Sequence, residues 1–185
     1  MNVCCLYYDG FCEFEVVLAM NQFRGNHFTV ALEDRAYLSE EGQKFLPDQM
    51  LQDVNPDEID LLIIPGGDPS HLYDNVPLRE FITALHEKNK LIAGICGGVE
   101  LMAKFGLLDH KKCTGDGRGI VLNDNNREIF KHVTIVDEDV VQDGNCITSK
   151  GQAFIEFAIE LGRVMKVFKN EQEAIDDYNW LKNIK

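Results

Sequence analysis

The stretch IAGICGGVELM at residues 92–102 places one cysteine between a strand and a helix. Residues 92–95 are apolar or small and predict the end of a buried strand, and the residues from Val99 onward predict a helix. Glycines before and after Cys96 predict a tight turn between them. A cysteine in such a turn is either an inert packing residue or a thiol held open for chemistry.

Strand-length apolar runs alternate with helix-period segments along the first two thirds of the chain. The pattern predicts strands at residues 3–8, 28–32, 60–65 and 91–95, and helices at residues 13–24, 78–88 and 99–105. The uninterrupted run at 60–65 is typical of a strand buried on both faces of a parallel sheet. We therefore predict an α/β fold with a doubly wound, mostly parallel sheet sandwiched by helices.

The rest of the chain adds short strands, loops and two helices. We predict a hairpin or extended excursion at 37–49, short strands at 111–114, 132–136, 140–142 and 146–148, a loop at 115–126, a long helix at 152–168 and an acidic helix at 171–183. Residues 1–168 are expected to form a single domain, with residues 169–185 packed on it.

Composition limits the classes of function. The 185 residues carry a net charge of -13, which argues against a nucleic-acid footprint or an anionic-membrane patch. No run approaches the roughly 20 apolar residues of a membrane span, and the N-terminus lacks the basic start of a secretory signal. We expect a cytoplasmic protein with no nucleic-acid or membrane partner.

The six cysteines do not predict a metal centre. Neither C-x-x-C nor any Cys/His pair at zinc-finger spacing occurs, and most of the cysteines lie in apolar runs typical of buried thiols. We therefore expect no metal and no cofactor. Cys12 and Cys96 differ from the other cysteines because they fall in a loop and a turn.

The segment Gly94-Ile95-Cys96-Gly97-Gly98 is a cysteine version of the nucleophile elbow G-x-S-x-G. Such a turn usually forces the nucleophile into strained backbone geometry that leaves its side chain open. The N–H groups and dipole of the following helix favour thiolate, so a lowered thiol pKa is expected. The Gly97 N–H can face a developing oxyanion.

Two other segments supply groups that suit this thiol. Pro65-Gly66-Gly67 ends the preceding apolar strand, and its glycine amides could complete an oxyanion hole. The segment DGFCEFEVV at residues 9–17 puts Glu13 and Glu15 in the first turns of a helix. Both acids suit a solvated helix start, but Glu15 also suits a site-facing position, where its carboxyl would have a raised pKa and donate a proton to sulfur.

With the closing segment ITSKGQAFIEFA at 147–158, these elements resemble the PfpI-like superfamily. That superfamily includes the Parkinson's-disease-associated protein deglycase and is related to the class I glutamine amidotransferases. The resemblance covers about residues 2–168 and implies a flavodoxin-like fold and a homodimer. It also implies a reactive Cys96, a Glu15 carboxyl bonded to it, and oxyanion amides at Gly67 and Gly97. Many members oxidise this cysteine to a sulfinic acid.

A catalytic histidine is missing from the expected places. Gly97 stands where many members have a histidine, and the segment KKCTGDG at 111–117 offers Asp116 instead. The His-x-Glu pair of the amidotransferases is absent. His71, in the loop after Gly67, is the histidine expected to reach the site, and Gly66 and Asp116 are further expected lining residues.

Two classes of function remain open. The first is a cysteine-dependent hydrolase or lyase without a catalytic histidine, acting on reactive carbonyl compounds or their adducts in stress protection, with isocyanide hydration as a variant. The second is an oxidative-stress sensor or chaperone-like module that responds through oxidation of Cys96. The missing histidine disfavours a peptidase and a glutamine amidotransferase.

Overall fold

The computed structural model describes residues 1–185 and has a seven-stranded sheet at its centre. Its strands are β1 (Val3–Leu6), β2 (His27–Ala31), β5 (Gln49–Met50), β6 (Leu61–Ile64), β7 (Leu91–Ile95), β10 (Val140–Asp143) and β11 (Cys146–Ser149). Their order is β10-β11-β7-β6-β1-β2-β5, and every pair is parallel except β10 with β11. The predicted mostly parallel α/β sheet is confirmed.

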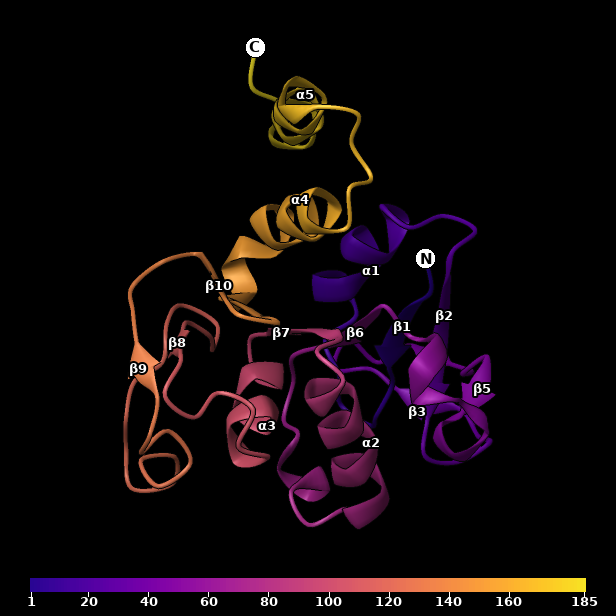
Figure 1. Cartoon of the computed structure of the whole chain (residues 1–185), viewed down its shortest axis with the longest axis vertical. Helices are drawn as coiled ribbons and strands as arrows, with labels where there is room; N and C mark the ends of the chain where they lie inside the picture. The colour runs from indigo at the N-terminus through magenta and orange to yellow at the C-terminus, as the bar shows by residue number, and fades with distance from the viewer.

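Helices cover both faces of this sheet (Figure 1). Helices α1 (Phe14–Asn21) and α4 (Phe154–Val164) lie side by side on one face, and α2 (Val76–Glu87) and α3 (Gly98–Lys104) lie on the other. The chain reverses its direction of travel across the sheet at β1, which has β2 on one side and β6 on the other. In open α/β sheets, ligands bind beyond the carboxyl ends of the strands.

The centre of the sheet is the core of the protein. All four residues of β1 and all four of β6 are buried, because helices cover both faces of these strands. This burial explains the continuous apolar run at Leu61–Ile64, which has no polar alternation. It also fixes where the strands end, and therefore where the turns after β1, β6 and β7 meet.

Two small sheets flank the central one. β3 (Tyr37–Leu38) and β4 (Lys44–Phe45) form the expected hairpin, and β8 (Lys112–Cys113) pairs in parallel with β9 (Thr134–Ile135). The predicted short strands at 140–142 and 146–148 are β10 and β11, which form an antiparallel hairpin that turns at Gly144, with φ +62°. Short 3₁₀ turns lie at Leu51–Asp53, Pro56–Glu58, Ser70–Leu72 and Gly151–Ala153.

Helix α4 is shorter than the predicted helix at 152–168. It ends at Val164, because Lys166 takes a left-handed conformation with φ +56°. The N–H of Val167 donates to the Gly162 carbonyl at 2.9 Å and the N–H of Lys166 to the Arg163 carbonyl at 3.0 Å. This is a Schellman turn, and it folds the Phe168 ring back onto Gly162.

Helix α5 (Glu171–Lys182) packs on α4 near the C-terminus (Figure 1). Ala174 is buried in this contact, and the Glu156 carboxylate of α4 accepts from the Tyr178 hydroxyl at 3.0 Å. The same carboxylate pairs with the Lys182 ammonium at 2.8 Å. Trp180, by contrast, is 77% exposed.

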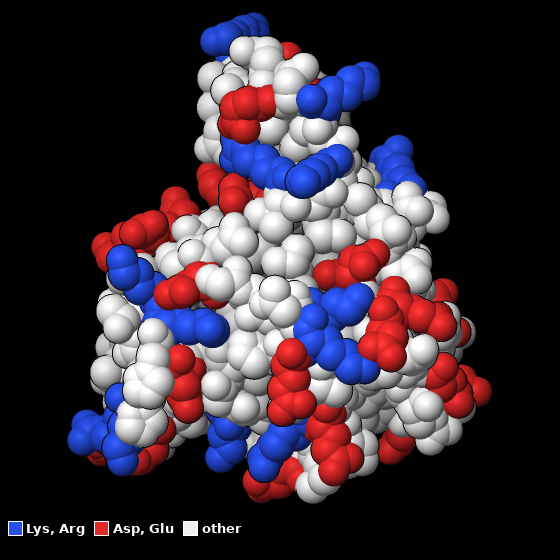
Figure 2. All heavy atoms as spheres, viewed as in Figure 1, with Lys and Arg blue, Asp and Glu red and all other residues white.

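The surface carries both signs of charge. On the face shown in Figure 2, Lys and Arg are interspersed with Asp and Glu, and no broad basic patch is visible. None of the helices has the length and apolar content needed to cross a bilayer.

Truncation of the core strand β6 should be costly. Ile63 is fully buried, so Ile63→Ala should lower the free energy of unfolding by about 2–5 kcal/mol. The matched control is Leu46→Ala, at a residue that is 71% exposed. This substitution should change the free energy of unfolding by about 0.5 kcal/mol or less. Urea unfolding of both variants measures this, and equal losses would contradict the assigned core.

Candidate functional site

Cys96 lies on the turn between β7 and α3 in a strained conformation. Its φ is +54°, a left-handed value that costs a non-glycine residue on the order of 1–3 kcal/mol. The backbone is held from both sides: its N–H donates to the Ser149 carbonyl at 2.9 Å, and its carbonyl accepts from the Asp116 N–H at 3.2 Å. The elbow geometry expected from the sequence is present.

Glu15 reaches the same point from the first turn of α1. Its side chain is buried, with 2% of the residue exposed, and its Oε2 accepts from the Gly66 N–H at 3.0 Å. The carboxyl and the Cys96 thiol are hydrogen-bond partners. Since Glu13 lies at the helix start and faces Glu41 and Gln43, only Glu15 of the two predicted acids meets the thiol.

Glycines make this meeting possible. A Cβ atom on Gly66 would lie 2.6 Å from the Cys96 Cβ and would overlap the Glu15 carboxylate. A Cβ on Gly151, just after β11, would lie 2.5 Å from Glu15 Oε1 and 3.1 Å from the Cys96 Sγ. The pair is therefore enclosed by backbone from two separate turns, and a side chain at either position would displace it.

Burial changes the acidity of both groups. It raises the pKa of the Glu15 carboxyl to about 7, although hydrogen bonds from Cys96 and Gly66 act in the opposite direction. Burial and the charge of Glu15 raise the pKa of the Cys96 thiol to about 12, with the Gly97 N–H opposing them. The expected lowering of the thiol pKa by the following helix is therefore wrong, because burial outweighs the field of a seven-residue helix.

The two groups titrate as a pair. Between the two pKa values, the pair holds one proton and one net negative charge. A thiolate arises in this range when the shared proton moves from sulfur to the Glu15 carboxylate, with no exchange with solvent. The site can present a nucleophile and an acid together.

A small cavity of about 40 Å³ opens beside Cys96. Its lining residues are Cys96, Gly97, Glu100, Asp116, Ile120, Asn126 and Phe130. Asp116 was expected there, whereas Glu100 and the three residues from the loop before β9 were not. Glu100 lies one helical turn after Cys96, a spacing that could have revealed it. The loop residues carry no local signal, because tertiary packing alone brings them to the thiol.

The two glycines proposed as oxyanion donors differ in their environment. The Gly97 N–H lies beside Cys96 at the start of α3 and lowers the pKa of its thiol. The Gly67 N–H makes no hydrogen bond within the chain, and Gly67 has φ +102° with its carbonyl packed against Gly97. The Gly66 N–H is occupied by Glu15. Gly97 and Gly67 therefore remain the proposed oxyanion donors.

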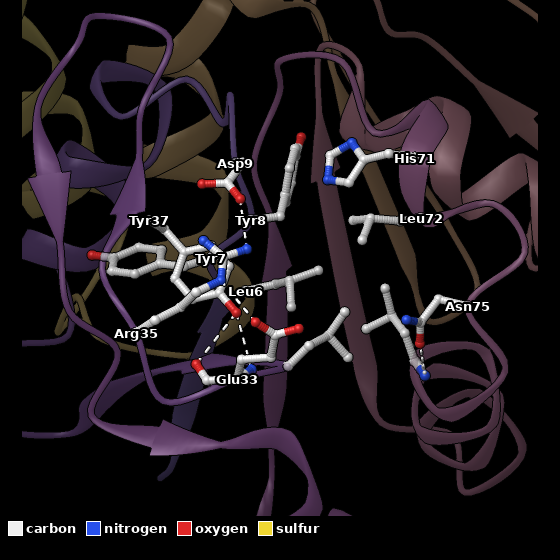
Figure 3. A pocket seen from close by; sticks show the side chains of 12 residues that line it. Leu6, Tyr7, Tyr8, Asp9, Glu33, Arg35, Tyr37, His71, Leu72 and Asn75 are labelled. Atoms are coloured by element: carbon white, nitrogen blue, oxygen red, sulfur yellow. Dashed lines mark hydrogen bonds and ion pairs between the residues drawn. The ribbon is translucent and has the colours of Figure 1, made fainter.

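His71 lies outside the Cys96 cavity. It belongs to the 3₁₀ turn Ser70–Leu72 and lines a different cavity of about 180 Å³, shown in Figure 3 with Tyr8, Asp9 and Arg35. Its ring packs 5.8 Å from that of Tyr8, whose hydroxyl donates to the Gly66 carbonyl at 2.6 Å. The turn after Pro69 thus directs this imidazole away from the thiol, and no histidine lines the Cys96 cavity.

The pH dependence of stability reports on Glu15. Its pKa is higher in the folded chain than the ordinary value of 4.5, so the free energy of unfolding should fall as pH rises from about 4.5 to about 7, by at most about 3 kcal/mol. Glu15→Gln should remove this fall, whereas Glu128→Gln, in an exposed loop, should keep it. Urea unfolding at pH 5 and 8 tests this, and parallel wild-type and Glu15→Gln profiles would contradict it.

The chain is similar to known proteins. The model of the DJ-1/PfpI family matches residues 1–163. A Bacillus subtilis protein named uncharacterized protease YdeA is 36% identical over 104 residues, which are 56% of this chain and 51% of that protein, so this chain spans about half of that relative. The deglycase TK1284 of Thermococcus kodakarensis is 28% identical over 157 residues, covering 81% of this chain and 90% of that one.

The fold comparison agrees with the family match. The crystal structure of Drosophila melanogaster DJ-1beta superimposes with a TM-score of 0.82 at 22% identity, covering 98% of each chain. An identity this low shows the fold alone. Because the family match extends from the first strand through α4, it includes the elbow, Glu15 and both glycine turns. The chain belongs to the DJ-1/PfpI family.

Proposed function

We propose that this protein is a cysteine-dependent enzyme that acts on small, reactive carbonyl compounds or their adducts, in the manner of a glyoxalase or deglycase. The observation that carries the proposal is the buried Cys96–Glu15 pair, which holds one proton and one negative charge near neutral pH. The deglycase name of the Thermococcus relative supports the same reading. The 40 Å³ cavity suits a molecule of a few heavy atoms.

A 1,2-dicarbonyl such as methylglyoxal illustrates the chemistry. The Cys96 sulfur attacks the aldehyde carbon, the C=O electron pair moves to oxygen, and that oxygen takes the proton from Glu15, which forms a hemithioacetal. The Gly97 and Gly67 N–H groups are proposed to stabilise the oxygen as charge develops. The Glu15 carboxylate is then placed to act as a general base.

The remaining steps need only water. Glu15 removes the C–H proton of the hemithioacetal carbon and returns it to the neighbouring carbon, while the hydroxyl proton passes from the oxygen of the first carbon to the oxygen of the second. The adduct becomes a thioester on Cys96. Water hydrolyses the thioester, releases a 2-hydroxy acid and restores the thiol. One water is added overall, and no outside oxidant or reductant is consumed.

A peptidase function has little support in this site. Peptide hydrolysis needs a base and an acid for the leaving amine, and no histidine lines the cavity. The cavity is also small for a peptide segment. The protease name of the Bacillus relative therefore does not change the proposal.

Turnover of methylglyoxal to lactate tests the enzyme. Cys96→Ser should reduce kcat/KM to background, and Glu15→Gln should reduce it by about 10²–10⁴-fold, because the acid–base group is lost. Cys12→Ser should keep most of the activity, since that thiol bonds to Glu40 at 2.6 Å and lies outside the Cys96 cavity. Activity in Cys96→Ser equal to wild type would refute the assignment. Isocyanides are the second substrate class to assay.

An oxidation sensor is the second candidate. In this proposal the Gly97 N–H and the Glu15 carboxyl, which both act on the pKa of the Cys96 thiol, hold the oxygens of a sulfinate. In this chemistry one peroxide converts the thiolate to sulfenate and water, and a second peroxide converts sulfenate to sulfinate and water. The raised thiol pKa opposes rapid oxidation, because less free thiolate is present.

Mass spectrometry after mild peroxide treatment separates the two candidates. The sensor predicts a gain of two oxygens on the Cys96 peptide in a protein that turns over neither dicarbonyls nor isocyanides. Glu15→Gln should lower the yield of the two-oxygen form, because the carboxyl no longer donates to the product. Turnover by a chain whose Cys96 stays reduced would reject the sensor.

The homodimer and the cytoplasmic location stay proposals. In support of a dimer, α1 exposes Phe14 by 48% and Val17 by 53%, which is unusual for large apolar side chains on one short helix.

A further inference from the structure

We propose that the Cys96 cavity selects uncharged electrophiles over carboxylate-bearing ones of the same size, and that Glu100 and Asp116 are the specificity-determining residues. This inference rests on the proposed function for the carbonyl class of substrate. The charge selection itself applies to any electrophile that approaches the sulfur.

The cavity wall carries negative charge only. Glu100 and Asp116 are its charged lining residues, and no Lys, Arg or His lines it. Behind the wall, the Cys96–Glu15 pair adds one further negative charge near neutral pH. An anionic electrophile is therefore repelled by the two carboxylates of the wall and by the negative charge of the Cys96–Glu15 pair. A neutral electrophile of the same shape meets no such repulsion.

Glu100 is held in place on this wall. Its Oε1 accepts from the Tyr73 hydroxyl at 2.5 Å, and its position in α3 puts it one turn beyond Cys96. The side chain is half-buried, so its charge is less screened by water than that of a surface carboxylate. Lys104 lies over the Tyr73 ring at 5.3 Å and makes no ion pair with Glu100.

Asp116 is the second carboxylate of the wall and is exposed to solvent. One of its carboxylate oxygens accepts from the Gly117 N–H at 2.6 Å. Its charge still reaches the thiol, as its effect on the pKa of Cys96 shows. Water screens part of this charge, because the residue is exposed.

Nearby cations do not neutralise the wall. Lys150, the residue before Gly151, is tied to Asp137 at 2.7 Å and Asp139 at 3.4 Å. Arg118 follows Asp116 by two residues, but it lies outside the lining and makes no ion pair. No cationic side chain therefore neutralises the negative charge of the two carboxylates that line the cavity.

Alkylation of Cys96 by iodoacetamide and iodoacetate measures this selection without reference to turnover. The two reagents share size and leaving group and differ by one negative charge. The rates are read on the Cys96 peptide by mass spectrometry and divided by those of a small uncharged model thiol. After this correction, wild type should react with iodoacetamide about tenfold faster than with iodoacetate, or more. A few nearby charges at an intermediate dielectric constant produce a repulsion of this size.

Variants identify the residues responsible. Glu100→Gln keeps an oxygen for Tyr73 and should narrow the preference for iodoacetamide by about threefold to tenfold. Asp116→Asn should narrow it by a similar factor. The matched control Glu87→Gln, at the exposed end of α2, should leave it unchanged. Salt screens these charges, so raising the ionic strength from about 0.02 M to about 0.5 M should also narrow the wild-type preference for iodoacetamide. This measurement requires no variant. No wild-type preference, or no response to Glu100→Gln, overturns the proposal.

A substrate pair separates this inference from the proposed function. The α-ketoaldehydes 2,3-dioxopropanamide and 2,3-dioxopropanoate differ only by an amide against a carboxylate, and wild type should process the amide at least about tenfold more efficiently, with the gap reduced in Glu100→Gln. If neither substrate reacts but the alkylation preference holds, the proposed function fails and the charge selection stands. If both substrates react equally and alkylation shows no preference, the charge selection fails and the enzyme stands.

Discussion

The proton shared by Glu15 and Cys96 is the interaction on which the rest of the site depends. Burial raises the pKa of both groups, so each becomes a weaker acid than it would be in water. What makes the pair useful is the short path between them, along which one proton serves two atoms. The Gly66 N–H, the left-handed Cys96 backbone and the bare Cα of Gly151 all maintain that path. The chemistry proposed for this thiol therefore depends on the position of a proton more than on its loss.

Local sequence signals predicted most of the fold and half of the site. The uninterrupted apolar run at Leu61–Ile64, the glycines around Cys96 and the early position of Glu15 are all short-range patterns, and each led to the correct element. The end of α4 was not predictable, because it depends on Phe168 folding back onto Gly162. The cavity wall at Ile120, Asn126 and Phe130 was missed for the same reason, since a loop from another part of the chain supplies it.

The pKa of the Cys96 thiol is the other property that local sequence signals predicted wrongly. A helix start after a cysteine predicts a lowered pKa only when water remains near the sulfur. Here the Glu15 carboxyl and two glycine turns replace that water, and the desolvation they cause exceeds the effect of the helix. The missing imidazole fits this picture. With His71 placed against Tyr8 in the neighbouring cavity, proton movement at the sulfur falls to carboxyl groups.

The contact of Gly151 with Glu15 and Cys96 has a consequence for how the protein is made. The three residues come from the start, the middle and the end of the domain, and β11 is the element that brings Gly151 to the thiol. During synthesis, a chain that has not yet produced β11 cannot enclose Cys96, because the Ser149 carbonyl that binds its N–H is also absent. Contacts of such high sequence separation form late in folding. The nascent chain thus carries a cysteine without this enclosure, and the buried pair with Glu15 is complete only when the last strand of the sheet is in place.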